Sequence, residues 1–224
     1  IMKFNFGLIY KRMLDFLRSS KILLLYFWGI KVEEKIHDYF WDVVTINLKN
    51  LIDKQHLEKF NCYLDMGCGH IAILGIYFKK KYPLSCVTSV DVYKEFVENA
   101  KNTSYLNSAE ITFLHSNLFE KIIKKYDCIS FNPPYKPDTN EGSGKQLYKK
   151  TTYSGKDGLD ISRKFLNEAP EYLDKNGRIY LGINNYFVSR GECLNMIKCS
   201  KFIIVKEHKR FFNTSTIYEL KLNF

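Results

Sequence analysis

Several features that assign proteins to common classes are absent or scarce in this chain. Its 224 residues hold only five prolines, and none of its six cysteines forms a C-x-x-C pair. The longest apolar run, at residues 22–30, has nine residues, whereas a membrane-spanning helix needs about 20. A zinc site, a disulfide framework and a transmembrane helix are therefore not indicated. The cysteines lie mostly in apolar stretches and are predicted to be buried free thiols in a reducing compartment.

The sequence shows no internal repeat, low-complexity linker or secretory signal pattern. The apolar run at 22–30 lies far from the N-terminus and lacks a small-residue cleavage pattern. We therefore expect a cytoplasmic protein without a membrane partner.

Acidic residues are scarce relative to basic ones. Asp and Glu number 24 against 34 Lys and Arg, which gives a net charge of +10 and a pI of about 9.2. This balance suits an anionic partner such as nucleic acid, but it reports on electrostatic steering and not on fold. A hydrophobic content of 46% with 16% aromatics indicates a packed globular core.

Hydrophobic patterns predict alternating strands and helices. Helical spacing of apolar residues covers 3–30 and 36–52. We then predict strands at 62–65, 85–90, 111–114, 127–131 and 178–183, and helices at 72–80, 94–106 and 161–173, the last with a stop signal at 174–177. Alternating runs at 202–211 and 217–222 indicate a closing hairpin. The order favours a doubly wound, mostly parallel sheet that ends in an antiparallel hairpin.

The N-terminal segment differs from the rest in pattern. Five basic residues and one acid between residues 3 and 30 give it a charge of +4. We predict a basic helical extension at residues 1–35, which caps the active site or binds substrate, and a catalytic domain at residues 36–224.

A glycine-containing turn follows the first predicted strand. Asp65, Gly67, Cys68 and Gly69 lie between that strand and the next helix. Glycines let the backbone approach a ligand closely, and the carboxyl edge of such a sheet is the usual place for a nucleotide-like ligand. We predict that these four residues contribute to a cofactor site.

Polar residues also follow the second and third predicted strands. Asp91 and Val92 follow the second strand, where a carboxylate can accept both hydroxyls of a ribose or cap the helix that begins near Lys94. Asn117 and Leu118 follow the third strand and offer a side-chain acceptor, a backbone N–H and an apolar wall. We include Asp91, Val92, Asn117 and Leu118 in the predicted cofactor site.

Asn132, Pro133, Pro134 and Tyr135 follow the fourth predicted strand and form what we call the ledge (residues 132–135). Proline lacks an N–H donor and pushes the preceding residue into an extended conformation. The Asn132 side-chain oxygen and the Pro133 carbonyl can therefore both accept hydrogen bonds from one –NH2 group, while Tyr135 stacks on the planar group that carries it. We predict that these four residues are catalytic.

Together these motifs resemble the class I S-adenosylmethionine-dependent amino-methyltransferases, whose signature is [D/N/S]-P-P-[Y/F/W]. The resemblance implies a Rossmann-like α/β fold with a mostly parallel seven-stranded sheet, a C-terminal antiparallel hairpin and an N-terminal helical extension. It implies S-adenosylmethionine as cofactor, Asn132 among the residues that contact it, and no metal. Ile71 replaces the third glycine of the family pattern D-x-G-x-G-x-G. A non-catalytic scaffold is therefore an alternative, against which the intact ledge argues.

The segment after the ledge narrows the resemblance. Residues 154–159, Ser-Gly-Lys-Asp-Gly-Leu, and residues 168–170, Glu-Ala-Pro, are similar to the G-G-x-D-G-L and E-A-P motifs of the HemK group of protein-glutamine methyltransferases. Ser154 replaces the first glycine. The resemblance implies a protein substrate, a glutamine of a translation release factor or a ribosomal component.

Two other substrate classes use the same ledge. A nucleic-acid base methyltransferase would place an unpaired guanine or adenine on Tyr135. The lysines that follow the ledge suit a phosphate backbone, although three nearby acids reduce the charge of this segment to +2; they are Lys136, Lys145, Lys149, Lys150 and Lys156. A small-molecule amine is the third class, and fold does not choose between them.

Overall fold

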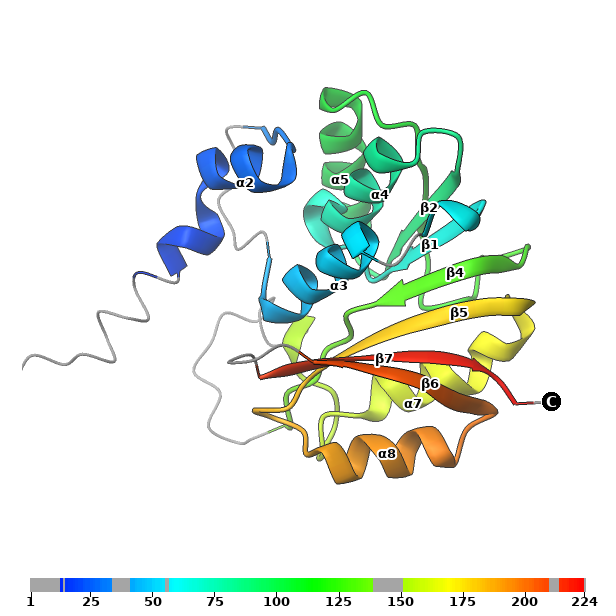
Figure 1. The fold of residues 1–224 in the computed structure, drawn as a ribbon. Coiled ribbons are helices and arrows are strands. Elements are labelled where there is room, and N and C mark those ends of the chain that lie inside the picture. Colours follow the sequence, from blue (N-terminus) through cyan, green and yellow to red (C-terminus); the bar gives the residue numbers. More distant parts are fainter. Residues whose placement is uncertain are drawn as a thin grey trace, which may run out of the picture.

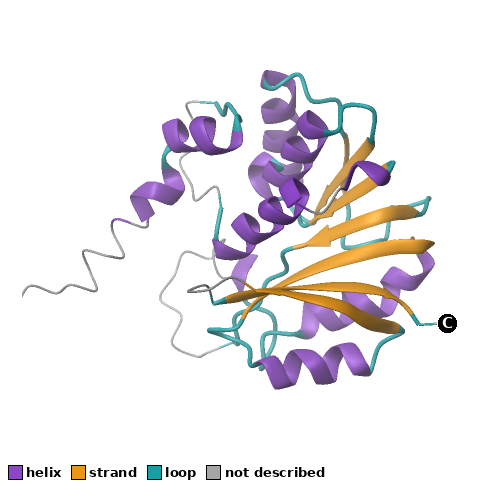
Figure 2. Ribbon diagram, in the orientation of Figure 1, coloured by secondary structure: helices purple, strands orange, loops and turns teal. Residues whose placement is uncertain are grey.

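A seven-stranded sheet runs through the protein, with helices on both faces (Figure 1; Figure 2). The computed structural model describes residues 13, 15–33, 41–54, 57–138, 151–209 and 214–223. The strand order is β3-β2-β1-β4-β5-β7-β6. β7 is antiparallel to both of its neighbours, and the other pairs are parallel. The order reverses direction between β1 and β4, the place where such sheets bind ligands.

The strands have the following bounds: β1 Cys62–Met66, β2 Cys86–Asp91, β3 Thr112–His115, β4 Tyr126–Phe131, β5 Leu173–Asn184, β6 Phe202–Lys209 and β7 Ser215–Leu222. The central strands are buried on both faces, as the continuous apolar runs of parallel strands require. In the register, Met66 lies beside Val90 on one side and Phe131 on the other. The segments that follow these three residues therefore leave the sheet at one edge.

Two helical layers cover the sheet. Figure 1 shows α3, α4 and α5 on one face and α7 and α8 on the other. Each layer has its own apolar core. The bounds are α3 Val43–Lys54, α4 Ile73–Lys81, α5 Lys94–Leu106, α7 Asp160–Glu168 and α8 Arg190–Lys198.

The predicted fold class is confirmed: a mostly parallel seven-stranded sheet closed by the antiparallel β6–β7 hairpin. Three boundaries were wrong. The helix predicted at 36–52 begins at Val43, after Asp42, whose side chain accepts the Thr45 N–H as an N-cap does; residues 34–40 lie outside the described part. The helix predicted to reach residue 173 ends at Glu168, and a short turn containing Pro170 follows. The stop signal at 174–177 lies inside β5, at a shift in its register with β4.

The helix α8 was missed by the sequence analysis. It begins with a capping box, in which Ser189 accepts the N–H of Glu192 and the Glu192 carboxylate accepts from Ser189. Ser-x-x-Glu before an apolar pattern is a recognisable start of a helix, so the signal was present in the sequence.

The helix α2 (Lys21–Trp28) attaches the N-terminal segment to the rest of the chain. Ser20 caps its start and Gly29, in a left-handed conformation, ends it. Leu24 and Trp28 are buried in the same core as α3 and α4, and the Trp28 ring packs edge-on against Tyr77 at 5.7 Å. Most of the apolar run at 22–30 is thus a helix that docks through Leu24 and Trp28 and leaves Ile22, Leu25, Tyr26 and Phe27 exposed. The division at residue 35 stays a prediction, and residues 1–12 lie outside the described part.

The prediction for the cysteines is only partly correct. All six are free thiols; Cys68, Cys128 and Cys193 are buried, Cys62 is half-buried, and Cys86 and Cys199 are exposed. Cys86 begins β2 at the surface and Cys199 follows α8, so their positions at element ends expose them. Within the described ranges, no helix has the length and apolar character to cross a membrane.

Leu24→Ala should lower the free energy of unfolding by about 2–5 kcal/mol, because it leaves a cavity beneath α2. Ile22→Ala, on the exposed face of the same helix, is the matched control and should change stability little. Urea unfolding of both variants measures the difference. Equal effects would show that α2 does not contribute to the core.

Candidate active site

The glycine turn (residues 67–69) leaves the carboxyl end of β1. The Cys68 N–H donates to the Val90 carbonyl at 2.9 Å, which fixes the turn against β2. Gly67 and Gly69 have φ values of +65° and +66°, a region that favours glycine. A Cβ on Gly67 would also lie 3.0 Å from the Phe131 ring. The backbone here is therefore bare and faces the sheet edge.

Ile71, at the position of the third glycine, does not face this edge. Its side chain is buried in the core, and the short turn that holds it packs against α5. The left-handed conformation occurs one residue later, at Ala72, with φ of +45°. Isoleucine in place of glycine at position 71 therefore adds a side chain to the core and none to the backbone surface of residues 67–69.

Asp91 binds the glycine turn from the neighbouring strand. Its Oδ2 accepts the Gly69 N–H at 2.9 Å and its Oδ1 accepts the Tyr93 N–H at 3.0 Å. Tyr93 occupies the N-cap position of α5, so Asp91 is not the cap. Burial raises the pKa of Asp91, and these backbone N–H groups oppose the shift. Each carboxylate oxygen has a second lone pair, which leaves acceptors for a ligand hydroxyl.

Asp65 lies beneath the turn. It is 3% exposed, and its Oδ2 accepts the Gly75 N–H of α4 at 3.0 Å. Burial raises its pKa to about 7, the Gly75 N–H opposes the shift, and the nearby Asp91 adds to it. Its visible contact joins β1 to α4, so it supports the turn from inside.

Asn117 and Leu118 lie in the turn after β3. The Asn117 Nδ2 donates to Glu120 Oε1 at 2.8 Å, which holds the side chain. Leu118 is buried and has a positive φ of +48°. Val92, beyond Asp91, is half exposed, and its carbonyl contacts the His115 ring nitrogen at 3.1 Å. Three of the predicted segments, which follow β1, β2 and β3, thus meet at one edge of the sheet.

The ledge follows β4 and is tied to the start of α3. Asn132 Nδ2 lies 3.1 Å from both Asp42 Oδ1 and Thr45 Oγ1. The Tyr135 hydroxyl donates to Asp42 Oδ2 at 2.6 Å. Burial and the Asp42 carboxylate raise the pKa of Tyr135 well above its ordinary value. The Tyr135 ring stacks on Phe187, with centroids 5.8 Å apart.

Asn132 Oδ1 is buried and accepts no hydrogen bond from any residue in the described ranges. An unsatisfied buried acceptor costs about 1–3 kcal/mol, so native proteins seldom retain one without a reason. Pro133 is buried beside it and brings no N–H donor.

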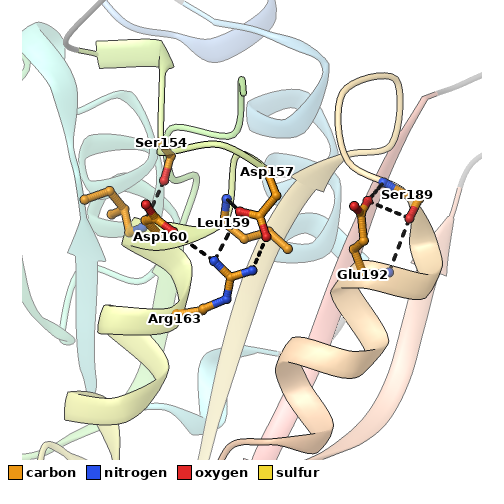
Figure 3. Close-up of polar contacts among 8 residues, drawn as sticks. Ser154, Asp157, Leu159, Asp160, Arg163, Ser189 and Glu192 are labelled. Carbon is orange, nitrogen blue, oxygen red and sulfur yellow. Dashed lines mark hydrogen bonds and ion pairs between the residues drawn. The ribbon is translucent and has the colours of Figure 1, made fainter. Parts of the chain in front are cut away.

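The segment at residues 154–160 holds the ledge from behind. Ser154 N–H donates to the Lys136 carbonyl, and Ser154 Oγ accepts the Ile161 N–H at 2.9 Å. Figure 3 shows Asp157 and Asp160 pointing at Arg163, which donates hydrogen bonds to both carboxylates. These contacts indicate that the motif at residues 154–159 supports the ledge.

Gly158 lies very close to the backbone of the ledge. Its φ is +78°, and a Cβ there would clash with the carbonyl oxygen of Tyr135. The backbone of the ledge therefore rests directly on a position that only glycine fills without strain.

Sequence reasoning missed Asp42, Phe187 and the structural role of Gly158. Asp42 directly precedes a helix, which is an N-cap signal, but nothing local links it to the ledge. Among the lysines after the ledge, Lys136 lies with its Nζ 5.0 Å from the Phe187 ring. Lys145, Lys149 and Lys150 lie outside the described residues.

The residues present fit the predicted cofactor. The bare glycine turn, the Asp91 carboxylate and the buried, unsatisfied Asn132 oxygen lie on consecutive strand ends at the switch point of the sheet. This fold and site define the class of S-adenosylmethionine-dependent methyltransferases.

The chain belongs to the methyltransferase small domain family, whose model matches residues 41–211. A putative protein N5-glutamine methyltransferase of Methanocaldococcus jannaschii is 32% identical over 170 residues, which is 75% of this chain and 82% of that protein. A release factor glutamine methyltransferase of Streptococcus pneumoniae is 32% identical over 155 residues, 67% of this chain and 54% of that protein. The chain thus spans most of the archaeal relative and about half of the bacterial one.

Among solved structures, a methyltransferase of Pyrococcus furiosus has a TM-score of 0.65 and 18% identity, and the alignment covers 95% of this chain and 98% of that one. This likeness supports the fold. The family and the relatives agree on the enzyme class, so the protein is a methyltransferase.

The raised pKa of Asp65 predicts a pH-dependent stability. A carboxyl whose pKa is higher in the folded chain than its ordinary value of 3.8 favours folding when protonated. Its contribution is complete below pH 3.8 and is lost as the pH rises through about 7. The stability of Asp65→Asn relative to the native chain should therefore increase between pH 4 and 8, by about 1.4 kcal/mol per unit of pKa difference.

Urea unfolding at several pH values measures this difference. Asp53→Asn is the control, because the pKa of Asp53 is shifted in the opposite direction. Burial works to raise the pKa of Asp53, but hydrogen bonds from Lys49, Tyr77 and Lys81 lower it to about 2, so its contribution is lost only as the pH falls through that value. A pH-independent difference for Asp65→Asn would contradict the assignment.

Gly158→Ala should weaken the support of the ledge. A side chain at φ +78° that meets the Tyr135 carbonyl forces a backbone shift, and we expect a loss of about 1–3 kcal/mol in stability together with reduced methyl transfer. Gly191→Ala, inside α8 and without a close neighbour, is the control and should be neutral or stabilising. Thermal unfolding and single-turnover activity measure both. Full activity in Gly158→Ala would exclude this role.

Proposed function

We propose that this methyltransferase transfers a methyl group from S-adenosylmethionine to the side-chain amide nitrogen of a protein glutamine, in a translation release factor. The observation that carries the proposal is the Asn132 oxygen, which is buried and unsatisfied beside a residue without an N–H. A primary amide has two N–H donors, and this corner offers two acceptors, Asn132 Oδ1 and the Pro133 carbonyl. The similarity to glutamine methyltransferases supports the same substrate.

The cofactor would lie along the three strand ends. The bare backbone of residues 67–69 admits its amino-acid part, Asp91 accepts the ribose hydroxyls, and Asn117 and Leu118 border the base. When bound, S-adenosylmethionine supplies an electrophilic methyl group on a sulfonium. Cys68, Val92 and Asp65 complete the predicted set, with Asp65 acting from beneath the turn.

The protein's contribution is to align and polarise the amide. An amide nitrogen is a poor nucleophile because its lone pair is delocalised into the carbonyl. Two acceptors that hold both N–H bonds favour a nitrogen on which positive charge develops, and this interaction is strongest in the transition state. Tyr135 and Pro134 lie on either side of the planar group. After the transfer and the release of the demethylated cofactor, one of the two N–H protons passes to solvent from the acidic, positively charged nitrogen, so no histidine base is required.

Purified protein, radiolabelled S-adenosylmethionine and a translation release factor test the proposal. Label should appear on a glutamine of the release factor and disappear when that glutamine is replaced by asparagine or alanine. Parallel reactions contain total RNA, DNA or a mixture of small amines. If the label appears in nucleic acid and nuclease removes it, the substrate is a nucleic-acid base. A release-factor substrate would agree with the cytoplasmic location that the sequence predicts.

Asn132→Ala should reduce kcat by about 100-fold or more, the scale of one lost transition-state hydrogen bond. Cofactor affinity, measured by titration calorimetry, should change little, because other strand ends hold most of the cofactor. Asn195→Ala, on an exposed position of α8, is the matched control. If Asn132→Ala retained full turnover, the acceptor role would be wrong.

A further inference from the structure

One carboxylate organises both functional side chains of the ledge. Asp42 Oδ1 accepts from Thr45 N–H at 2.8 Å, Thr45 Oγ1 at 2.8 Å and Asn132 Nδ2 at 3.1 Å. Its Oδ2 accepts from the Tyr135 hydroxyl at 2.6 Å. Oδ1 thus takes three of the four donors, one more than its two lone pairs, so they share it, and Oδ2 takes the fourth.

The chemistry of this group fixes which way the Asn132 amide points. An amide side chain has an –NH2 end and an oxygen end of similar size, and either can face a mixed partner. An ionised carboxylate only accepts, so it selects the –NH2 end. Thr45 Oγ1 gives its proton to Asp42, and its lone pairs then also face the Asn132 Nδ2. The Asn132 oxygen is thereby turned away from Asp42.

We propose that Asp42 is a positioning residue that orients the Asn132 oxygen toward the substrate amide and holds the Tyr135 ring beside it. This inference rests on the proposed function. Asp42 does not touch the reacting atoms in this assignment; it acts through the two ledge residues. The contact spans 90 residues of sequence, between the start of α3 and the end of β4.

The arrangement also accounts for the unsatisfied Asn132 oxygen. If the amide were reversed, its oxygen would face the Asp42 carboxylate and its –NH2 would face the sheet edge, where two donors would meet a substrate –NH2. Such a ledge could not accept from the substrate. The energetic cost of the buried free acceptor is therefore offset only when the substrate is bound.

Asp42→Asn tests this role with little change of shape. Asparagine keeps the N-cap, but it presents an amide that can pair with either orientation of Asn132. We expect kcat to fall by about 10–100-fold, on the scale of a misplaced catalytic group, with the Kd for cofactor little changed. In the Asn132→Ala background the same change should cost less than about threefold, because residues that act as a unit are not additive.

Two control variants separate positioning from helix capping. Asp42→Ser retains a good N-cap for α3, but one hydroxyl cannot hold Asn132 and Tyr135 together. Asp53→Asn makes the same chemical change at the other end of α3, where the carboxylate pairs with Lys49 and Lys81. We expect Asp42→Ser to lose activity like Asp42→Asn and Asp53→Asn to remain fully active. Wild-type activity in Asp42→Ser, or additive losses in the double variant, would overturn the inference.

A readout independent of activity completes the test. In 15N-labelled protein, the Asn132 –NH2 resonance is identified by its loss in Asn132→Ala. Its exchange with water should be slow in the native chain and about tenfold or more faster in Asp42→Asn, since a charge-assisted hydrogen bond is lost. Unchanged exchange would refute the contact. If the native chain labels no glutamine, the proposed function fails and this measurement still decides the role of Asp42.

Discussion

The parallel pairing of β1 with β2 and β4 is the constraint on which the site depends. It sets Met66 level with Val90 and Phe131, so that three segments far apart in sequence leave the sheet together. A slip by one residue would reverse the side chains of a whole strand, and the different packing of the two cores on either side of the sheet opposes it. The glycine turn, Asp91 and the ledge are therefore positioned by core packing, and they need few direct contacts with one another.

Two buried carboxyl groups lie next to the glycine turn, where any charge they carry is negative, although the chain as a whole is positively charged. Asp65 and Asp91 lie within a protein of net charge +10, and burial raises the pKa of both. The hydrogen bonds that hold both of them come from backbone N–H groups. A cationic ligand at the turn would lower the pKa of both carboxyls, which favours a sulfonium cofactor over an anionic one. It also argues against a scaffold that binds nothing there.

The sequence was sufficient for the order of strands and for the residues at the strand ends, because these follow from local patterns. It was not sufficient for contacts that tertiary packing creates. Asp42 carries a local capping signal, and only the fold brings it to Asn132 and Tyr135. The turn signal at 174–177 was overridden by pairing of β5 with β4, which continues on both sides of a register shift. The sequence indicates only that Gly158 is a loop residue, and the fold shows that it contacts the carbonyl of Tyr135.

The surroundings of Tyr135 bear on the choice of substrate. Its hydroxyl is bound to Asp42 and its ring stacks on Phe187 with centroids 5.8 Å apart. A nucleobase between the two rings would need about 7 Å, twice a van der Waals contact of about 3.5 Å. A base inserted there would have to displace Phe187, which lies in the β5–α8 connection and packs against the core. A glutamine side chain carries its amide on a slender methylene stem and needs less room beside Tyr135 than a base between the rings would, which favours the amide.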